Sequence, residues 1–150
     1  MNATIRTTVL LLCVWLASAP GLAQPGPQKL RAIRLNAGIH NITAELASTP
    51  GERQIGLMMR PQMGSNEGML FVFESAGQQC FWMKDTLIPL AIAFIEDDGT
   101  IVNIDTMRPQ TLGQHCSAKP VRYALEMNEG WFAKRGIRPG SKVTGLPRAP

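Results

Sequence analysis

The sequence predicts a mainly β fold of the α+β class, namely a compact β-barrel or sandwich of about seven to eight short strands with two short covering helices. Two observations support this prediction. Short apolar or alternating runs follow one another, separated by turn residues, and they do not alternate with long helical patterns. Two of these runs are also apolar on both faces, which is typical of strands in the middle of a sheet.

The N-terminal 23 residues of this 150-residue chain have the pattern of a secretory signal peptide. Arg6 gives a positive start, residues 9–17 form an apolar core well short of the ~20 residues of a membrane span, and Gly21 and Ala23 are small residues at the cleavage positions. The alternative is an uncleaved membrane anchor. We expect the protein to be periplasmic or secreted and to contact the membrane only during export.

The remaining chain is expected to form one domain. Its predicted parts are a flexible leader over residues 24–29, a single domain over 30–146 and a tail over 147–150. The net charge is +4, and no basic run is longer than the Lys134-Arg135 pair. Nucleic acid is therefore not an expected partner.

The strands are predicted from alternation and from apolar runs. Residues 30–35 and 39–46 alternate around turn residues and predict a hairpin. Residues 69–73 and 90–95 are apolar on both faces and predict central strands. Another strand is expected over 121–127. Shorter extended segments are expected at 80–83, 101–104 and 142–146.

Two short helices are predicted as covers. Thr49 and Glu52 fit a capping box, and the helix that they start is expected to end at Arg60, which precedes a proline. A second helix is expected over residues 129–135, with Asn128 as its cap.

Cys80 and Cys116 are the two cysteines that follow the signal peptide. In an oxidising compartment an isolated pair is most simply a disulfide, which we therefore predict. A zinc site that adds His115 would have only three ligands and would compete with that bond. We expect no metal and no cofactor.

The segment Phe81-Trp82-Met83-Lys84-Asp85-Thr86 places polar groups inside an apolar stretch. If the segment is extended, Trp82 and Lys84 share one face and could supply an aromatic wall and a cation to a ligand pocket. The alternative is a packed Trp, a solvated Lys and an Asp that serves the turn. The candidate ligand-binding residues, with two arginines added as possible anion contacts, are Trp82, Lys84, Asp85, Thr86, Arg60 and Arg108.

Several blocks of this chain together resemble the bacterial and archaeal family called domain of unknown function 192. They are Gly-Leu-Met-Met-Arg at 56–60, Gly-Met-Leu-Phe-Val-Phe at 68–73, the segment at 81–86 with Pro-Leu after it, and Tyr-Ala-Leu-Glu at 123–126. The resemblance spans roughly residues 30–146 and implies a single compact, strand-rich and often exported domain, without an assigned reaction. The family usually has Asn at the position of Asp85 and often Asp at that of Ala91.

Three functions remain open. The first hypothesis is a non-catalytic binding or envelope-accessory domain, whose partner is an unknown small molecule or an envelope protein. The second is a small periplasmic hydrolase that uses Asp85 or Glu126 as general base. Glu126 and Glu129 could form a pair of carboxylates for such a reaction. The alternative is that Glu126 occupies an outward strand position.

The third hypothesis is copper handling through methionine and cysteine sulfur. Met58, Met59 and Met63 lie close together in the sequence. The alternative is that Met58 and Met59 face the core from the first helix, because Met commonly fills gaps in cores.

Overall fold

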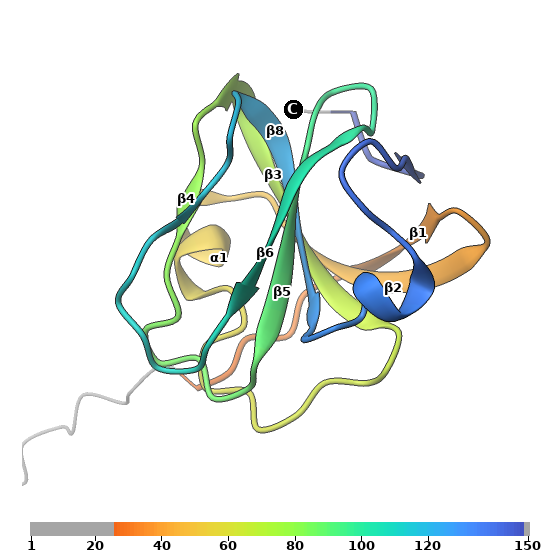
Figure 1. Cartoon of the computed structure of the whole chain (residues 1–150). Coiled ribbons are helices and arrows are strands. Elements are labelled where there is room, and N and C mark those ends of the chain that lie inside the picture. The colour runs from red at the N-terminus through yellow and green to blue at the C-terminus, as the bar shows by residue number, and fades with distance from the viewer. Residues whose placement is uncertain (1–25, 149–150) are drawn as a thin grey trace, which may run out of the picture.

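A computed structural model describes residues 26–148, so the predicted signal peptide and the final two residues lie outside the described part (Figure 1). Within it, no helix is long and apolar enough to cross a membrane. The elements are β1 (Ala32–Ala37), β2 (His40–Ala47), α1 (Pro50–Ile55), β3 (Glu67–Gly77), β4 (Cys80–Phe81), β5 (Leu90–Ile95), β6 (Ile101–Met107), β7 (His115–Cys116), β8 (Val121–Asn128), the 3-10 helix η1 (Ala133–Arg135) and β9 (Val143–Thr144).

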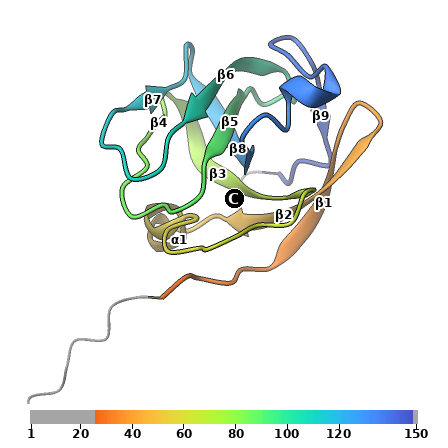
Figure 2. The same ribbon diagram turned by 60° about the horizontal axis from the view of Figure 1, so that its bottom comes forward.

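Seven strands form one curled sheet in the order β6-β5-β8-β3-β2-β1-β9, while β4 and β7 form a separate two-stranded ladder (Figure 2). Neighbouring strands are antiparallel except β2 and β3, which are parallel and are connected through α1. A bridge between Thr100 and Lys142 brings the two ends of the sheet together. The predicted mainly β architecture is confirmed.

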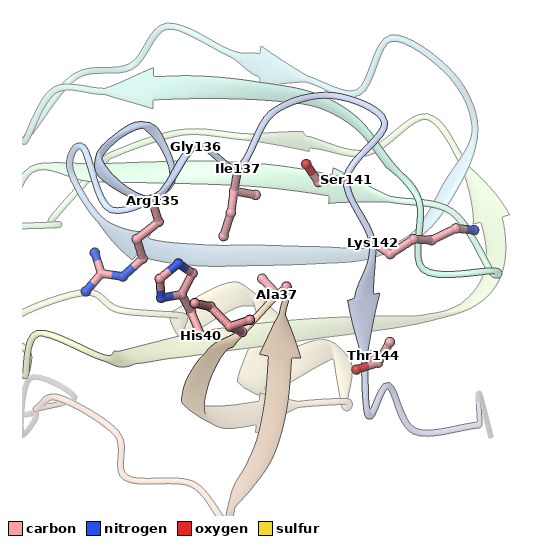
Figure 3. A pocket seen from close by; sticks show the side chains of 10 residues that line it. Ala37, His40, Arg135, Gly136, Ile137, Ser141, Lys142 and Thr144 are labelled. Carbon is pink, nitrogen blue, oxygen red and sulfur yellow. The ribbon is translucent and has the colours of Figure 1, made fainter.

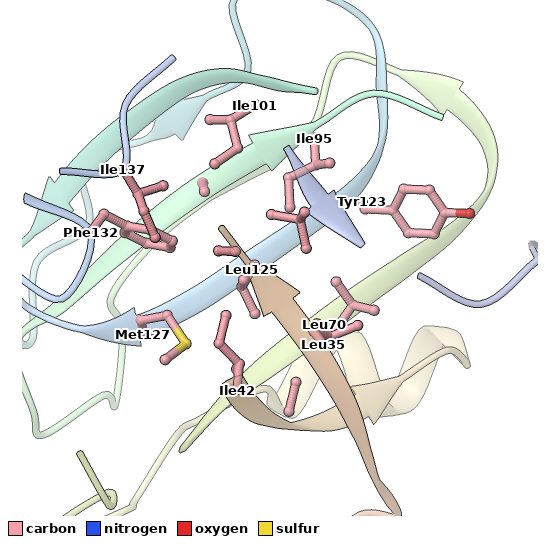
Figure 4. Packing of buried hydrophobic residues seen from close by; sticks show 14 of the residues in the cluster. Leu35, Ile42, Leu70, Ile95, Ile101, Tyr123, Leu125, Met127, Phe132 and Ile137 are labelled. Atoms are coloured by element: carbon pink, nitrogen blue, oxygen red, sulfur yellow. The ribbon is translucent and has the colours of Figure 1, made fainter. Parts of the chain in front are cut away.

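The central strands β5 and β8 and the first half of β3 are buried on both faces, which explains their nearly continuous apolar sequences. One face packs against β1, β9 and the segment 131–137 in what we call the Leu125 cluster (Figure 4). The other face packs against Leu57 and the segment 81–88 in what we call the Phe94 cluster. The sheet therefore separates two apolar layers, with α1 beside the second one (Figure 1).

The first helix begins as predicted and ends early. The Thr49 hydroxyl accepts a hydrogen bond from the Glu52 amide, and the Glu52 carboxylate accepts one from the Thr49 amide, which completes the capping box. The helix ends at Ile55, because Gly56 adopts a left-handed φ of 49°. The predicted end at Arg60 is therefore wrong.

Two further helix predictions also need correction. The chain leaves the helical path before the methionines. As a result Leu57 is buried in the core, whereas Met59, which was expected to face the core, is exposed. The helix expected over residues 129–135 is only the single turn η1. Asn128 does not cap it; its side-chain amide donates instead to the carbonyl oxygens of Met63 and Gly64.

Candidate functional site

Strand β8, in the middle of the sheet, carries a buried carboxyl group. Glu126 is 4% exposed and lies opposite Met69 of β3 and Ile92 of β5. The expected outward position is wrong, because both faces of β8 are covered. Burial raises the pKa of Glu126 to about 8, and no hydrogen bond or ion pair from residues 26–148 lowers it.

Glu126 lines a small cavity of about 40 Å³ between the sheet and its cover. A site needs roughly 10–15 Å³ to hold one water molecule, so this cavity has room for a small chemical group. The walls come from the end of α1 and the turn after it, from β3, and from the segment 81–86. The lining side chains with polar, aromatic or sulfur atoms are Arg53, Gln54, Met58, Phe71, Phe81, Trp82, Thr86 and Glu126.

Aromatic rings form much of the cavity wall. Phe81 meets Phe71 edge-on with ring centroids 4.9 Å apart, so these two rings hold each other in place. Trp82 is 49% exposed, which places part of the cavity wall at the surface. The Lys84 Nζ atom lies 5.6 Å from the Trp82 ring centroid, within the range of a cation–π contact.

The candidate residues of the segment 81–86 lie together in the structure. Trp82 and Thr86 line the cavity, Lys84 contacts Trp82, and Asp85 occupies the turn between them with a left-handed φ of 56°. The Asp85 carbonyl oxygen accepts a hydrogen bond from the Met59 amide at 2.8 Å. This bond ties the segment to the turn after α1, so two walls of the cavity are joined.

The two candidate arginines lie elsewhere. Arg60 donates to both carboxylate oxygens of Glu45, at 2.8 and 2.7 Å, and to the Gln28 carbonyl oxygen at 2.7 Å. Both side chains of this ion pair are largely buried. Arg108 is exposed at the end of β6. Neither arginine lines the cavity above Glu126.

The Sγ atoms of Cys80 and Cys116 lie 2.09 Å apart, at disulfide distance, and the two residues pair directly in the β4–β7 ladder. The disulfide therefore uses both of the thiols that the alternative zinc site would need as ligands. His115 is turned to Asp105, with Nδ1 and Oδ2 2.5 Å apart. Across residues 26–148 no three His, Cys, Asp or Glu side chains are grouped as metal ligands.

The remaining predicted groups are spread over the fold. Met58 lines the cavity, whereas Met63 packs against the Phe94 cluster. Glu129 is exposed beyond the end of β8. Ala91 pairs with Met127 in the Leu125 cluster, so it lies on the opposite face of the sheet from Glu126. The difference at Ala91 therefore removes no group from the cavity.

A larger hollow of about 550 Å³ lies between the tip of the β1–β2 hairpin and residues 135–144 (Figure 3). Its cations, Arg135 and Lys142, lie at opposite ends and are engaged. Arg135 donates to Asn66 at 2.9 Å and lies over the Trp131 ring. Lys142 pairs with Asp98 at 2.5 Å. The smaller cavity has the more unusual chemistry, because its carboxyl group forms no ion pair with any residue from 26 to 148.

Comparison with known proteins gives the same family as the sequence blocks. The model of domain of unknown function 192, described as "Uncharacterized ACR", matches residues 32–145. No curated protein matches the chain.

Two crystal structures are similar to this chain along nearly their whole length. One, from Sinorhizobium meliloti 1021 and named a "putative transcription regulator", is 38% identical with a TM-score of 0.70, covering 80% of this chain and 95% of that one. The other, a protein of unknown function from Novosphingobium aromaticivorans DSM 12444, is 35% identical with a TM-score of 0.74, covering 81% and 93%. This chain therefore belongs to the family of domain of unknown function 192.

Proposed function

We propose that this protein is an exported, non-catalytic binding domain that holds part of a small molecule or of an envelope protein in the cavity above Glu126. The observation that carries the proposal is the buried Glu126 carboxyl group, which lines the cavity without a partner from residues 26–148. Among the described residues no fully buried side-chain oxygen lacks a hydrogen-bond partner, so the Glu126 carboxyl oxygens face the space of the cavity. A ligand in this cavity could therefore form hydrogen bonds to Glu126.

The surface around the cavity supports binding of a ligand that is larger than the cavity itself. Among the described residues five large apolar side chains are exposed, and four of them, Met59, Trp82, Leu87 and Leu112, lie on segments around the 83–86 turn. Backbone hydrogen bonds join these segments: Met59 donates to Asp85 at 2.8 Å, and Met83 donates to Thr111 at 3.0 Å. Exposed apolar side chains gathered in one place commonly mark a binding surface.

Export is proposed from the N-terminal pattern and from the cysteine pair. Expression of the full chain in a Gram-negative bacterium, followed by fractionation and N-terminal sequencing, tests it. We expect periplasmic protein that begins at Gln24 and has no free thiol before reduction. Recovery of the intact chain in the cytoplasm would contradict export.

Binding is tested by NMR of the oxidised protein with a library of small amines, amides, alcohols and acids. At least one compound should shift the backbone amides of Leu57, Phe81 and Thr86 in a saturable way. The same compound should have little effect on Glu126→Gln and its full effect on Glu129→Gln, which changes an exposed carboxylate three positions away. If no compound affects these amides, the proposed function is wrong.

A second candidate function is a small hydrolase in which Glu126 transfers protons. The observation that favours it is the raised pKa of Glu126, because a carboxyl group that titrates near pH 8 can act as a general acid at neutral pH. Assays with ester, peptide and glycoside substrates test it. A hydrolase should lose about 100-fold or more of its kcat in Glu126→Gln, whereas a protein that only binds should show no turnover above the buffer rate.

A further inference from the structure

We infer that the group bound above Glu126 is a primary ammonium on an unbranched alkyl stem, such as the end of an alkylamine or of a lysine side chain. This inference rests on the proposed function, since it names the ligand class of the same cavity. Three features of the site lead to it: the carboxyl group at its base, the aromatic rings in its wall, and its volume.

The carboxyl group selects for a donor. Ionised Glu126 would offer only acceptor atoms, and a primary ammonium offers three N–H donors and a full positive charge. Because only 4% of Glu126 is exposed, a cation that pairs with it in the cavity gains more there than it would at the open surface. A carboxylate ligand, by contrast, would place a negative charge in the same buried space, either beside ionised Glu126 or against its protonated form without a cation to pair with.

The aromatic wall also favours a cation. Phe71, Phe81 and Trp82 line the cavity, and the faces of such rings attract ammonium groups through their quadrupoles. The protein already shows this preference, since the Lys84 ammonium lies 5.6 Å from the centroid of Trp82. An amide or hydroxyl group would gain less from these rings than a cation would.

The other charged group of the lining, Arg53, is engaged elsewhere. Its guanidinium donates to the carbonyl oxygens of Ser48 and Val72 and lies 5.1 Å from the centroid of the Phe73 ring. It forms no ion pair with Glu126 in the described structure. Arg53 is therefore not the counter-ion of the buried carboxyl, and the place of that counter-ion is open to a ligand.

The volume limits the size of the cation. About 40 Å³ corresponds to roughly three water-sized groups, which suits an ammonium with one or two methylenes. A trimethylammonium head, with three methyl groups around its nitrogen, is larger than this volume. The rest of an alkyl stem would then leave the cavity along Trp82 and reach the exposed apolar side chains around it.

Proton release provides a signature of this ligand. Because burial raises the pKa of Glu126 to about 8, the free protein holds a proton on this carboxyl at pH 6.5. An ammonium that binds as an ion pair would displace that proton, so close to one proton should be released for each ligand bound. A neutral ligand that accepts a hydrogen bond from the protonated carboxyl would release none.

The test is calorimetric titration at pH 6.5 in two buffers of different ionisation enthalpy, with a panel of butyl compounds. We expect n-butylammonium to bind wild type with release of about one proton, and to bind Glu126→Gln at least 10-fold more weakly. Glu129→Gln should keep wild-type affinity to within about 2-fold. Butyltrimethylammonium, butyramide, n-butanol and butyrate should bind more weakly than n-butylammonium. A lysine-containing tripeptide with blocked ends then separates a protein ligand from a free amine.

The outcomes separate the two proposals. If butyramide or n-butanol binds better than n-butylammonium, or if n-butylammonium binds without proton release, the ligand class is wrong while the binding function remains supported. If the neutral and the ionic compounds both fail to bind wild type, the ligand class is wrong and the binding function loses support with it. Equal binding of n-butylammonium to wild type and Glu126→Gln would also overturn the inference.

Discussion

Glu126 makes the stability of the folded protein depend on pH. Its pKa is about 8 in the folded state and 4.5 in an ordinary exposed setting. Between these values the folded protein holds a proton that the unfolded chain has released, so the free energy of unfolding should fall as pH rises from 5 to 8. Each unit of pKa difference corresponds to about 1.4 kcal/mol, so the loss should amount to a few kcal/mol.

Urea unfolding of wild type and Glu126→Gln at pH 5 and pH 8 measures this contribution. Gln cannot ionise, so the variant should lose less stability over this range than wild type does. Glu129→Gln should keep the wild-type dependence, because Glu129 is exposed. If the free energy of unfolding changes equally with pH in wild type and Glu126→Gln, the Glu126 carboxyl does not hold the proton.

Asp85 is explained by its backbone conformation. Its φ of 56° lies in the left-handed region, which is unfavourable for residues that have a Cβ atom. Among these residues, Asn and Asp tolerate the region best. We expect Asp85→Asn to change the free energy of unfolding by less than about 0.5 kcal/mol, and Asp85→Val to lower it by about 1–2 kcal/mol. Thermal unfolding of both variants measures the difference. A large loss in Asp85→Asn would instead assign the carboxylate an essential contact.

Between elements, the buried Glu45–Arg60 pair joins β2 to the turn after α1. Burial alone would raise the pKa of Glu45, but hydrogen bonds from Arg60 and the Leu30 amide, together with the charges of Arg60 and Lys29, leave it below its usual value. Removal of one partner leaves the other charge buried without a counter-ion. Arg60→Met should therefore lower the free energy of unfolding by about 3–5 kcal/mol.

Arg108→Met is the matched control for Arg60→Met, because it removes an exposed arginine. It should change the free energy of unfolding by less than about 0.5 kcal/mol. Denaturation of both variants with urea at pH 7 provides the comparison. Similar losses in the two variants would show that the Glu45 ion pair contributes nothing specific.

The disulfide holds β4 against β7. These strands are two residues long, and a ladder of that length is not stable by itself. The bond closes a separation of 36 residues, for which the chain-entropy estimate is about 3–4 kcal/mol. The double variant Cys80→Ser, Cys116→Ser should lose about that much in urea unfolding without reductant. An unchanged free energy of unfolding would show that the β4–β7 ladder forms without the disulfide.

At the scale of the whole molecule, the two apolar clusters share one sheet, so they should unfold together in one transition. Native-state hydrogen exchange should be slowest at the amides of β8, which is paired on both edges and buried on both faces. The amides of β4, β7 and the turn after α1 should exchange sooner. Faster exchange in β8 than in β4 would contradict this order of stability.

The local parts of the fold could be predicted from the sequence, since alternation, capping and turn residues act over a few positions. The β1–β2 hairpin, the start of α1 and the strand β5 are of this kind. The parallel pairing of β2 with β3 could not be predicted, because no local pattern records which strands become neighbours.

The candidate site was predicted in part for the same reason. Trp82 and Thr86 can be predicted from the sequence because they are an aromatic and a polar group four positions apart in one apolar segment. The sequence predicts an outward position for Glu126, because a polar residue in an alternating strand usually faces solvent. Only the cover from α1 and the segment 81–86 buries it. The engagement of Arg60, predicted from the sequence as an anion contact of the ligand, could not be foreseen because its partner, Glu45, is 15 positions away in the sequence.

The position of the disulfide also bears on when the protein becomes competent to bind. Phe81, which follows Cys80 directly, forms part of the cavity wall, and the β4–β7 ladder holds it there. If the protein is exported as proposed, a newly made chain in the reducing cytoplasm would lack this bond, and Phe81 would lose the ladder that holds it in the cavity wall. On that proposal, ligand binding should begin only after oxidation, so the precursor would not carry a cytoplasmic ligand out of the cell.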